Sequence, residues 1–227
     1  MERKIVITGD GSSTIHLPEW DEQYHSKHGA IQEAYHVFIK HGLQFFLDCN
    51  MDFDKPISIL EIGFGTGLNA FITMLESEKL GISTDYTGIE AYPVVMDEIH
   101  QLNYPTQLHV TNGDKLFELL HLSHWDTQQQ TVPYFTLNKQ KKFFSEIKDT
   151  NAYNLIYFDA FGARVQPELW TESIFQKMYN ALKDNGVLVT YSAKGSVRRA
   201  MQAVGFKVEK LPGPPGKREM LRATKRL

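Results

Sequence analysis

The sequence has a single cysteine and no long apolar run. With Cys49 alone, no intramolecular disulfide can form, which fits a reducing compartment. No stretch reaches the roughly 20 apolar residues of a membrane-spanning helix, and the run behind Met1–Lys4 is too short for a signal peptide. Internal repeats and low-complexity segments are also missing. We therefore expect a cytoplasmic protein without membrane contact.

The chain of 227 residues is 42% hydrophobic, enough for the core of one large domain. Its small net charge of −3 conceals an asymmetry. Residues 192–227 contain ten Lys or Arg and two acids, whereas the rest of the chain contains 14 basic and 25 acidic residues. A basic end on an acidic body predicts docking of an anionic partner, and a solvated basic tail is the alternative.

A glycine-rich stretch follows the first clear strand pattern. Residues 57–62 predict a strand, Gly63, Gly65 and Gly67 a tight turn, and residues 68–79 a helix. Glycine allows positive φ and close approach of a ligand to the backbone, and a helix N-terminus offers free N–H groups. The stretch predicts a site for a nucleotide-like cofactor, with an ordinary strand–helix turn as the alternative.

The order of residues in this turn separates two cofactors. Dinucleotide enzymes favour Gly-x-Gly-x-x-Gly. Here Glu61 precedes three glycines at alternate positions, as in motif I of class I S-adenosylmethionine (SAM) methyltransferases, which this stretch resembles. A carboxylate at Glu61 attracts the sulfonium or amino group of SAM but repels a diphosphate. The pattern therefore favours SAM over NAD.

Two further acids end predicted strands. Glu90 follows a strand over residues 85–90 at the distance of a strand–helix–strand unit, where it can accept both hydrogen bonds of a ribose diol. Asp159 ends the apolar strand 153–159. Ligands of open α/β sheets lie beyond the carboxyl ends of the strands, so we expect Asp159 beside the reactive end of the cofactor.

Residues 102–150 give a weaker signal. Residues 108–111 predict a strand that ends at Asp114, and residues 125–137 predict a hairpin ahead of Asn138. Asp114 and Asn138 are alternatives for bonding the adenine amino group. His109, His121 and His124 occur here with Asp126, but their spacing does not predict a metal site.

The regions at the two ends of the chain have clear patterns. Residues 4–17 predict a β-hairpin, residues 31–39 an amphipathic helix with Glu33 off its apolar stripe, and residues 43–47 a second helical piece after Gly42. Near the other end, residues 206–211 and 221–224 predict an antiparallel ribbon. We predict an α/β fold: a Rossmann-like class I SAM-dependent methyltransferase domain over residues 56–227, with an N-terminal hairpin and helical extension over residues 1–55 packed on it.

Several motifs together resemble the methyltransferase domain of the bacterial tRNA-modifying MnmC proteins. The most specific are Val197-Arg198-Arg199 and residues 216–221, Gly-Lys-Arg-Glu-Met-Leu. The resemblance also rests on these stretches: Ser26–Glu33, Val37-Phe38, Glu61–Asn69, Phe158–Phe161, Pro167–Trp170 and Gly205-Phe206. It spans nearly the whole chain. One departure is that the family's Gly-Asp pair before the Asp159 strand matches Leu137-Asn138 here, so the resemblance favours Asn138 over Asp114.

The resemblance implies an activity. It predicts a SAM-dependent N-methyltransferase that converts 5-aminomethyl-(2-thio)uridine at the tRNA wobble position to the 5-methylaminomethyl nucleoside. It predicts the stand-alone form of the enzyme, with no FAD-dependent domain, no FAD and no metal. No obligate protein partner is evident in the sequence.

The expected site follows from both arguments. Asp159 is the expected catalytic residue, orienting the amine lone pair, with the proton acceptor left open. We expect cofactor contacts from Glu61, Gly63, Phe64, Gly65, Thr66, Gly67, Asn69, Glu90, Asn138 and Asp159. We expect substrate or tRNA contacts from Tyr24, His28, Glu33, Phe161, Lys194, Arg198, Arg199, Lys217 and Arg218.

Two other functions share parts of this pattern. A SAM enzyme or aminopropyltransferase acting on a small amine needs the glycine turn and Asp159 but not the basic C-terminal region. A non-enzymatic RNA-binding module needs the basic region but not an intact Glu61, Glu90 and Asp159. The presence of both sets of residues in one chain favours methylation of tRNA.

Overall fold

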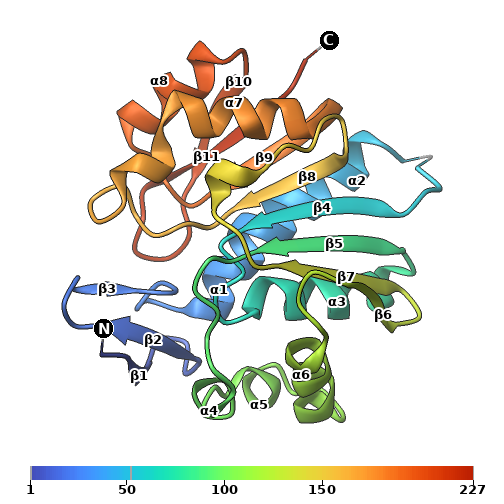
Figure 1. Ribbon diagram of the computed structural model, residues 1–227, viewed down its shortest axis with the longest axis vertical. Coiled ribbons are helices and arrows are strands. Elements are labelled where there is room, and N and C mark those ends of the chain that lie inside the picture. The colour runs from blue at the N-terminus through green and yellow to red at the C-terminus, as the bar shows by residue number, and fades with distance from the viewer. Residues whose placement is uncertain (1, 52, 227) are drawn as a thin grey trace.

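The computed structural model describes residues 2–51 and 53–226, and an eight-stranded sheet forms its centre (Figure 1). Five neighbouring strands are parallel: β9 (Leu182–Thr190), β8 (Tyr153–Phe158), β4 (Ile57–Ile62), β5 (Thr84–Ile89) and β7 (Phe135–Gln140). Antiparallel strands flank them: β6 (Gln128–Val132) beside β7, and β11 (Glu219–Thr224) then β10 (Lys207–Pro212) beside β9. The predicted α/β class and the C-terminal ribbon are confirmed.

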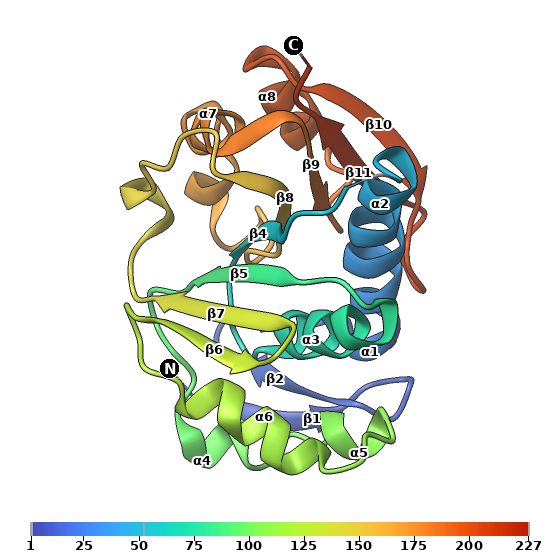
Figure 2. The ribbon, with the colours of Figure 1, turned by 90° about the vertical axis from the view of Figure 1, so that its right-hand side faces the viewer.

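Helices cover both faces of the sheet (Figure 2). On one face, Ile59, Tyr157 and Val189 pack in one core with helix α3 (Leu68–Leu80) and the helix of residues 30–49. On the other, Leu60 and Phe158 pack with α7 (Glu172–Ala181) and α8 (Gly195–Ala203). Because successive side chains of a strand point to opposite faces, strands buried on both faces have mostly apolar sequences, as β4 and β8 do.

The N-terminal hairpin is confirmed as β1 (Lys4–Ile7) and β2 (Ser13–Leu17). The structure adds β3 (Glu22–Gln23) as a third strand, which the sequence did not predict. A continuous helix follows as α1 (Ala30–Ala34), η1 (Tyr35–Gln44), which is π-helical, and α2 (Phe45–Cys49). The sheet, η1 and α3 therefore share one hydrophobic core.

The predicted break in this helix at Gly42 is wrong. Gly42 lies inside the helix, where an added Cβ would be 3.0 Å from Cγ2 of Val189 and 3.2 Å from the ring of Tyr157. The glycine permits close packing of helix on sheet rather than ending the helix. Sequence pattern alone does not separate these two uses of glycine.

An insertion of short helices occupies residues 96–122, with α4 (Met96–Ile99), α5 (Tyr104–Gln107) and α6 (Gly113–Leu122). The predicted strand at residues 108–111 is wrong. Pro105 lies in the first turn of α5, where its missing N–H costs nothing, and backbone bonds from Leu108 to Tyr104 and from Val110 to Pro105 continue the turn. The predicted hairpin is confirmed as β6 and β7, and short helices η2 (Phe144–Glu146) and η3 (Pro167–Trp170) lie in the later connections.

Over the described ranges, no helix is both long and apolar enough to cross a membrane.

Replacing Phe38 by Ala tests whether the helix of residues 30–49 is integral to the core. Phe38 is 1% exposed and its ring centre lies 5.1 Å from that of Tyr157. We expect Phe38→Ala to lower the free energy of unfolding by about 3–5 kcal/mol, measured by denaturant titration. Lys40→Ala, at an exposed position of the same helix, should change it by less than about 0.5 kcal/mol. A loss below about 1 kcal/mol for Phe38→Ala would show that residues 30–49 are a separable extension.

Candidate active site

The glycine turn connects β4 to α3 through left-handed backbone. Gly63, Gly65 and Gly67 have φ values of 91°, 51° and 73°. An added Cβ at Gly63 would lie 2.7 Å from the carbonyl oxygen of Asp159, and one at Gly67 would lie 2.9 Å from the ring of His121. The turn therefore needs glycine for both conformation and space.

Asn69, in the first turn of α3, joins two buried carboxyl groups. Its amide nitrogen donates to Glu61 Oε1 at 2.9 Å and to Asp159 Oδ2 at 2.8 Å. Glu61 is fully buried, and burial raises its pKa well above the usual range, with the Asn69 hydrogen bond opposing and the charge of Asp159 adding to the shift. Within the described chain, no hydrogen bond of standard geometry reaches Glu61 Oε2 or Asn69 Oδ1. The Tyr86 hydroxyl also interacts with Glu61 and lowers its pKa, so Asn69 Oδ1 is left as the buried oxygen of this group without a donor among the described residues.

Glu90 lies directly after β5 and closes the other side of the turn. Its Oε2 accepts from the Gly65 N–H at 3.1 Å and its Oε1 from the Tyr92 N–H at 2.9 Å. Glu61, Asn69, Glu90 and the three glycines therefore gather at the carboxyl ends of β4 and β5, as expected for the cofactor residues.

Two predicted cofactor residues of the turn direct their side chains inward. Phe64 is 3% exposed and packs edge-on against His121 and Trp125, with ring centres 6.0 Å apart in both pairs. Thr66 is fully buried. Only the backbone of these two residues is left to meet a ligand.

Asp159 follows β8 and has a side chain that is 8% exposed. Its N–H donates to the carbonyl of Ile62 at 2.9 Å, which fixes the strand end beside the glycine turn. Burial raises the pKa of Asp159 to about 7; the charge of Glu33 adds to the rise, and the Asn69 hydrogen bond and the charge of Lys217 oppose it. A carboxyl group with this pKa can exchange a proton near neutral pH.

His25 completes the surroundings of Asp159, and the sequence analysis did not select it. Its Nδ1 lies 4.0 Å from Asp159 Oδ2, and its Nε2 is 2.7 Å from Thr66 Oγ1, which also accepts from the Tyr104 hydroxyl at 3.2 Å. Burial lowers the pKa of His25 to about 4, so its ring is neutral at pH 7. Residues 20–28 have no periodicity, and no sequence signal separates His25 from Tyr24 or His28.

A cavity of about 230 Å³ opens beside Asp159. Its walls come from residues 22–28 and Glu33 of the N-terminal segment, residues 159–161 with Tyr191, and residues 216–217. Five of the predicted substrate residues line it together with Asp159: Tyr24, His28, Glu33, Phe161 and Lys217. The rings of Tyr24 and Phe161 meet edge-on at 4.9 Å. Glu33 is 5% exposed, because Lys217 binds its Oε1 and the Ser26 N–H donates to its Oε2.

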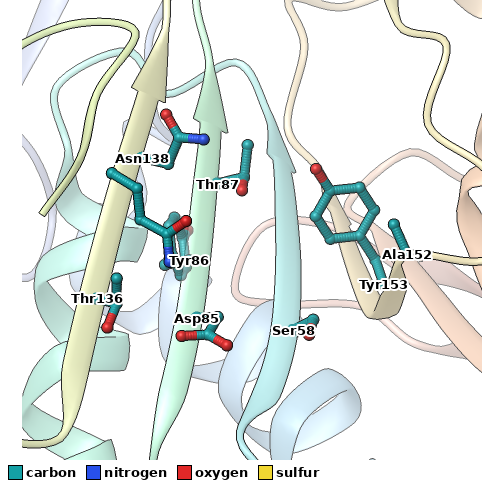
Figure 3. A pocket seen from close by; sticks show the side chains of 9 residues that line it. Ser58, Asp85, Tyr86, Thr87, Thr136, Asn138, Ala152 and Tyr153 are labelled. Carbon is teal, nitrogen blue, oxygen red and sulfur yellow. The ribbon is translucent and has the colours of Figure 1, made fainter. Parts of the chain in front are cut away.

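The structure does not bring Asn138 to this site. Asn138 lies inside β7, two residues before its end, and lines a separate cavity of about 170 Å³ with Asp85, Thr87 and Tyr153 (Figure 3). Asp114 is exposed in the first turn of α6. Neither side chain lines the cavity that contains Asp159. The contact of either residue with adenine stays a prediction.

The remaining predicted basic residues lie outside the cavity. Lys194, Arg199 and Arg218 are exposed, and Arg198 is half-buried. Val197, Ala200 and Met201 of α8 face the core, which leaves Arg199 on its exposed side. In the described part of the chain, no three His, Cys, Asp or Glu side chains group as metal ligands.

The sheet order and the glycine turn are those of a Rossmann-like fold, the fold that class I SAM-dependent methyltransferases have. A family described as S-adenosyl-L-methionine-dependent methyltransferase matches residues 136–226. Spermidine synthase from Thermotoga maritima has a related fold, with a TM-score of 0.54 at 14% identity over 94% of this chain and 68% of its own.

The more similar proteins are MnmC proteins. The tRNA 5-methylaminomethyl-2-thiouridine biosynthesis bifunctional protein MnmC is 27% identical in Actinobacillus pleuropneumoniae and 30% identical in Leptospira borgpetersenii, over 95% and 89% of this chain. The chain spans about a third of the length of these relatives, 34% and 32%. The crystal structure of MnmC2 from Aquifex aeolicus matches with a TM-score of 0.78 at 24% identity, covering 100% of this chain and 71% of that one. The resemblance to MnmC that the sequence predicted is confirmed.

The raised pKa of Asp159 predicts a pH-dependent cost to stability. Because the folded pKa of about 7 exceeds the ordinary value of 3.8, the native state binds more protons between these values and loses stability as pH rises through this window. We expect Asp159→Asn to gain up to a few kcal/mol over wild type at pH 8 and little at pH 4, measured by denaturant unfolding. Asp54→Asn, at an exposed position, should show no such dependence. An equal effect of Asp159→Asn at both pH values would contradict the raised pKa.

Proposed function

We propose that this protein is a SAM-dependent N-methyltransferase that methylates the amine of 5-aminomethyl-(2-thio)uridine at the tRNA wobble position. One observation carries the proposal: Asp159 stands between the glycine turn and a separate cavity, and contributes to both. Its Oδ2 accepts from Asn69 on the turn side, and its carboxyl group lines the cavity on the other. A donor on one side and an amine on the other would meet at this carboxyl group.

The residues at the turn fit SAM. Asn69 Oδ1 is a buried acceptor that no described donor reaches in standard geometry, and it stands beside the Glu61 carboxyl group. The positively charged amino group of SAM would bind these oxygens and would favour the ionised form of Glu61, against the effect of burial. Glu90 directly after β5 would bind the ribose hydroxyls, and Gly63, Gly65 and Gly67 provide the left-handed backbone of the turn. When bound, SAM supplies an electrophilic methyl group on a sulfonium sulfur. The proposed reaction uses neither FAD nor a metal.

Asp159 would prepare the amine. An alkylamine is mostly protonated at neutral pH, as lysine is, and an ammonium has no lone pair for attack. With a pKa of about 7, Asp159 is present in appreciable amounts as the carboxylate, which can accept a hydrogen bond from the ammonium and then its proton. The neutral amine can then donate one of its remaining N–H groups to the carboxyl group, which leaves its lone pair free to face the methyl group. Burial excludes water and holds the two groups in place, which supplies much of the rate.

The tRNA part of the proposal rests on the relatives and on surface charge. The MnmC relatives are named for biosynthesis of a modified tRNA uridine. Lys194, Arg199 and Arg218 are exposed, as contacts to tRNA phosphates require. We place the reaction in the cytoplasm. Methylation of a free small amine is the second candidate, since a spermidine synthase shares the fold, but it gives these surface cations no role.

The direct test is incubation with labelled SAM and tRNA that lacks this modification, followed by nucleoside analysis. We expect label in 5-methylaminomethyl-(2-thio)uridine. Asp159→Asn should lower the rate by about 10²–10⁴-fold, because the amide cannot accept a proton, while SAM affinity changes only a few-fold. Free alkylamines serve as the parallel substrate. Label transferred to them but not to tRNA would favour the second candidate, and wild-type turnover by Asp159→Asn would remove the assigned role.

A comparison of two glycines with similar backbone conformation distinguishes loss of SAM binding near the site from a general effect of backbone strain. Gly65 has φ 51° and faces the site, whereas Gly81 has φ 66°, ends α3 and has nothing within 4 Å of an added Cβ. Both changes to Ala should cost about 1 kcal/mol of stability. We expect only Gly65→Ala to weaken SAM binding, by more than tenfold in a calorimetric titration. Equal weakening by both variants would show that strain alone is responsible.

A further inference from the structure

An ion pair between distant segments forms one wall of the cavity. Glu33 lies on α1, and Lys217 lies in the loop between β10 and β11, 184 residues later. The Lys217 ammonium is 2.5 Å from Glu33 Oε1, and the Ser26 N–H donates to Oε2 at 2.9 Å. Both carboxylate oxygens of Glu33 are therefore satisfied inside the protein.

Lys217 is held in the wall rather than extended into solvent. Its Nζ lies 3.9 Å from the centre of the Tyr191 ring, a cation–π contact, and the Tyr191 hydroxyl donates to the carbonyl of Ala160 at 2.8 Å. Its neighbour Arg218 is exposed. This placement differs from the expectation that both residues contact tRNA phosphates, since the charge of Lys217 is already compensated by Glu33.

The charged groups around Asp159 are unequally paired. Three carboxylates line the cavity, those of Glu22, Glu33 and Asp159. Glu22 is 3.3 Å from Arg164, and Glu33 is paired with Lys217. Among the described residues, Asp159 is within contact distance of the neutral amide of Asn69 and the imidazole of His25, which burial keeps uncharged at pH 7, and no cation forms an ion pair with it. Glu61 does not line the cavity.

We propose that Lys217 is a positioning residue: by neutralising Glu33 it leaves Asp159 as the one carboxylate of the described cavity without a cationic partner, and so directs the substrate ammonium to Asp159. This inference rests on the proposed function. Without the charge of Lys217, a buried and unpaired Glu33 would compete for the same ammonium and hold it away from the reacting position. The pair thereby selects a substrate group with a single positive charge.

The electrostatics at Asp159 agree with this role. Beyond the dominant effect of burial, Glu33 raises the pKa of Asp159 and Lys217 lowers it, so the two charges of the pair oppose each other. Removing one member alone unbalances them. Removing both should restore the balance, which makes the pair suitable for a double-mutant cycle.

The test compares pH profiles of kcat/KM for methyl transfer from labelled SAM to tRNA lacking the modification. Because Asp159 acts as the carboxylate, activity rises with pH through its pKa. We expect Lys217→Met to raise the midpoint of this rise in activity by roughly one pH unit, and Glu33→Gln to lower it. A shift of this order is expected when a neighbouring charge is lost. Lys217→Met should also lose about fivefold in kcat at pH 7, because the carboxylate fraction of Asp159 falls from about one half to about one tenth. The double variant should return close to the wild-type midpoint and recover most of the rate.

Two further variants serve as controls. Lys217→Arg keeps the charge and should keep the midpoint, which preserves the test if Lys217→Met folds poorly in a thermal melt. Lys210→Met removes a cation from the exposed ion pair with Glu219, at 2.8 Å in the same ribbon, and should change neither midpoint nor rate.

Each contrary result has a distinct meaning. An unmoved midpoint in Lys217→Met, or a double variant no better than the singles, overturns the positioning role. Weaker tRNA binding with a smaller salt dependence, and no rescue by Glu33→Gln, assigns Lys217 to a phosphate contact instead. Failure of the proposed function is separate, because the wild-type protein itself would then bind SAM but label no tRNA nucleoside.

Discussion

The double hydrogen bond from Asn69 is the interaction on which the site depends. Two carboxyl groups, Glu61 and Asp159, are buried at the ends of adjacent parallel strands, an arrangement that desolvation and mutual repulsion both disfavour. The Asn69 amide nitrogen donates a hydrogen bond to each of them, at 2.9 and 2.8 Å. Asn69 can do so only because the glycine turn starts α3 at the correct place. The backbone conformation of the turn therefore sets the hydrogen bonds that stabilise the two buried carboxyl groups.

The N-terminal segment contributes as much to the site as the sheet does. The central sheet provides Asp159 and the glycine turn, but His25 and Glu33 come from the segment that precedes β4, the first strand of that sheet in the chain. Lys217 then joins this segment to the C-terminal ribbon across the cavity. The charge of Glu33 on one wall is compensated by Lys217 on another, so the cavity beside Asp159 exists only when three distant parts of the chain are assembled. For this reason the charges that line the cavity cannot be predicted from local sequence patterns.

The central strands were predictable because each is buried on both faces and bounded by turn residues. Residues 57–62 and 153–158 are mostly apolar, residues 84–89 were placed by their spacing from the glycine turn, and the acids at or next to the strand ends follow from where such strands stop. The helices of the insertion over residues 96–122 were not predictable, because a proline that opens a helix, as in α5, looks the same in sequence as one that breaks a helix. Glu33 was placed off the apolar stripe of its helix, yet it is buried because a lysine 184 residues away pairs with it.

The sequence by itself determined the order of elements, the glycine turn and the carboxylates at the strand ends, since these depend on residues close together in the chain. Tertiary structure alone decided that His25 is buried and neutral beside Asp159, and that Lys217 belongs to the cavity wall rather than to the basic surface. It also decided that Asn138 lines a second, separate cavity. The physical reason is that burial and charge compensation are set by neighbours in space. A side chain's protonation and partners follow from contacts that local sequence does not encode.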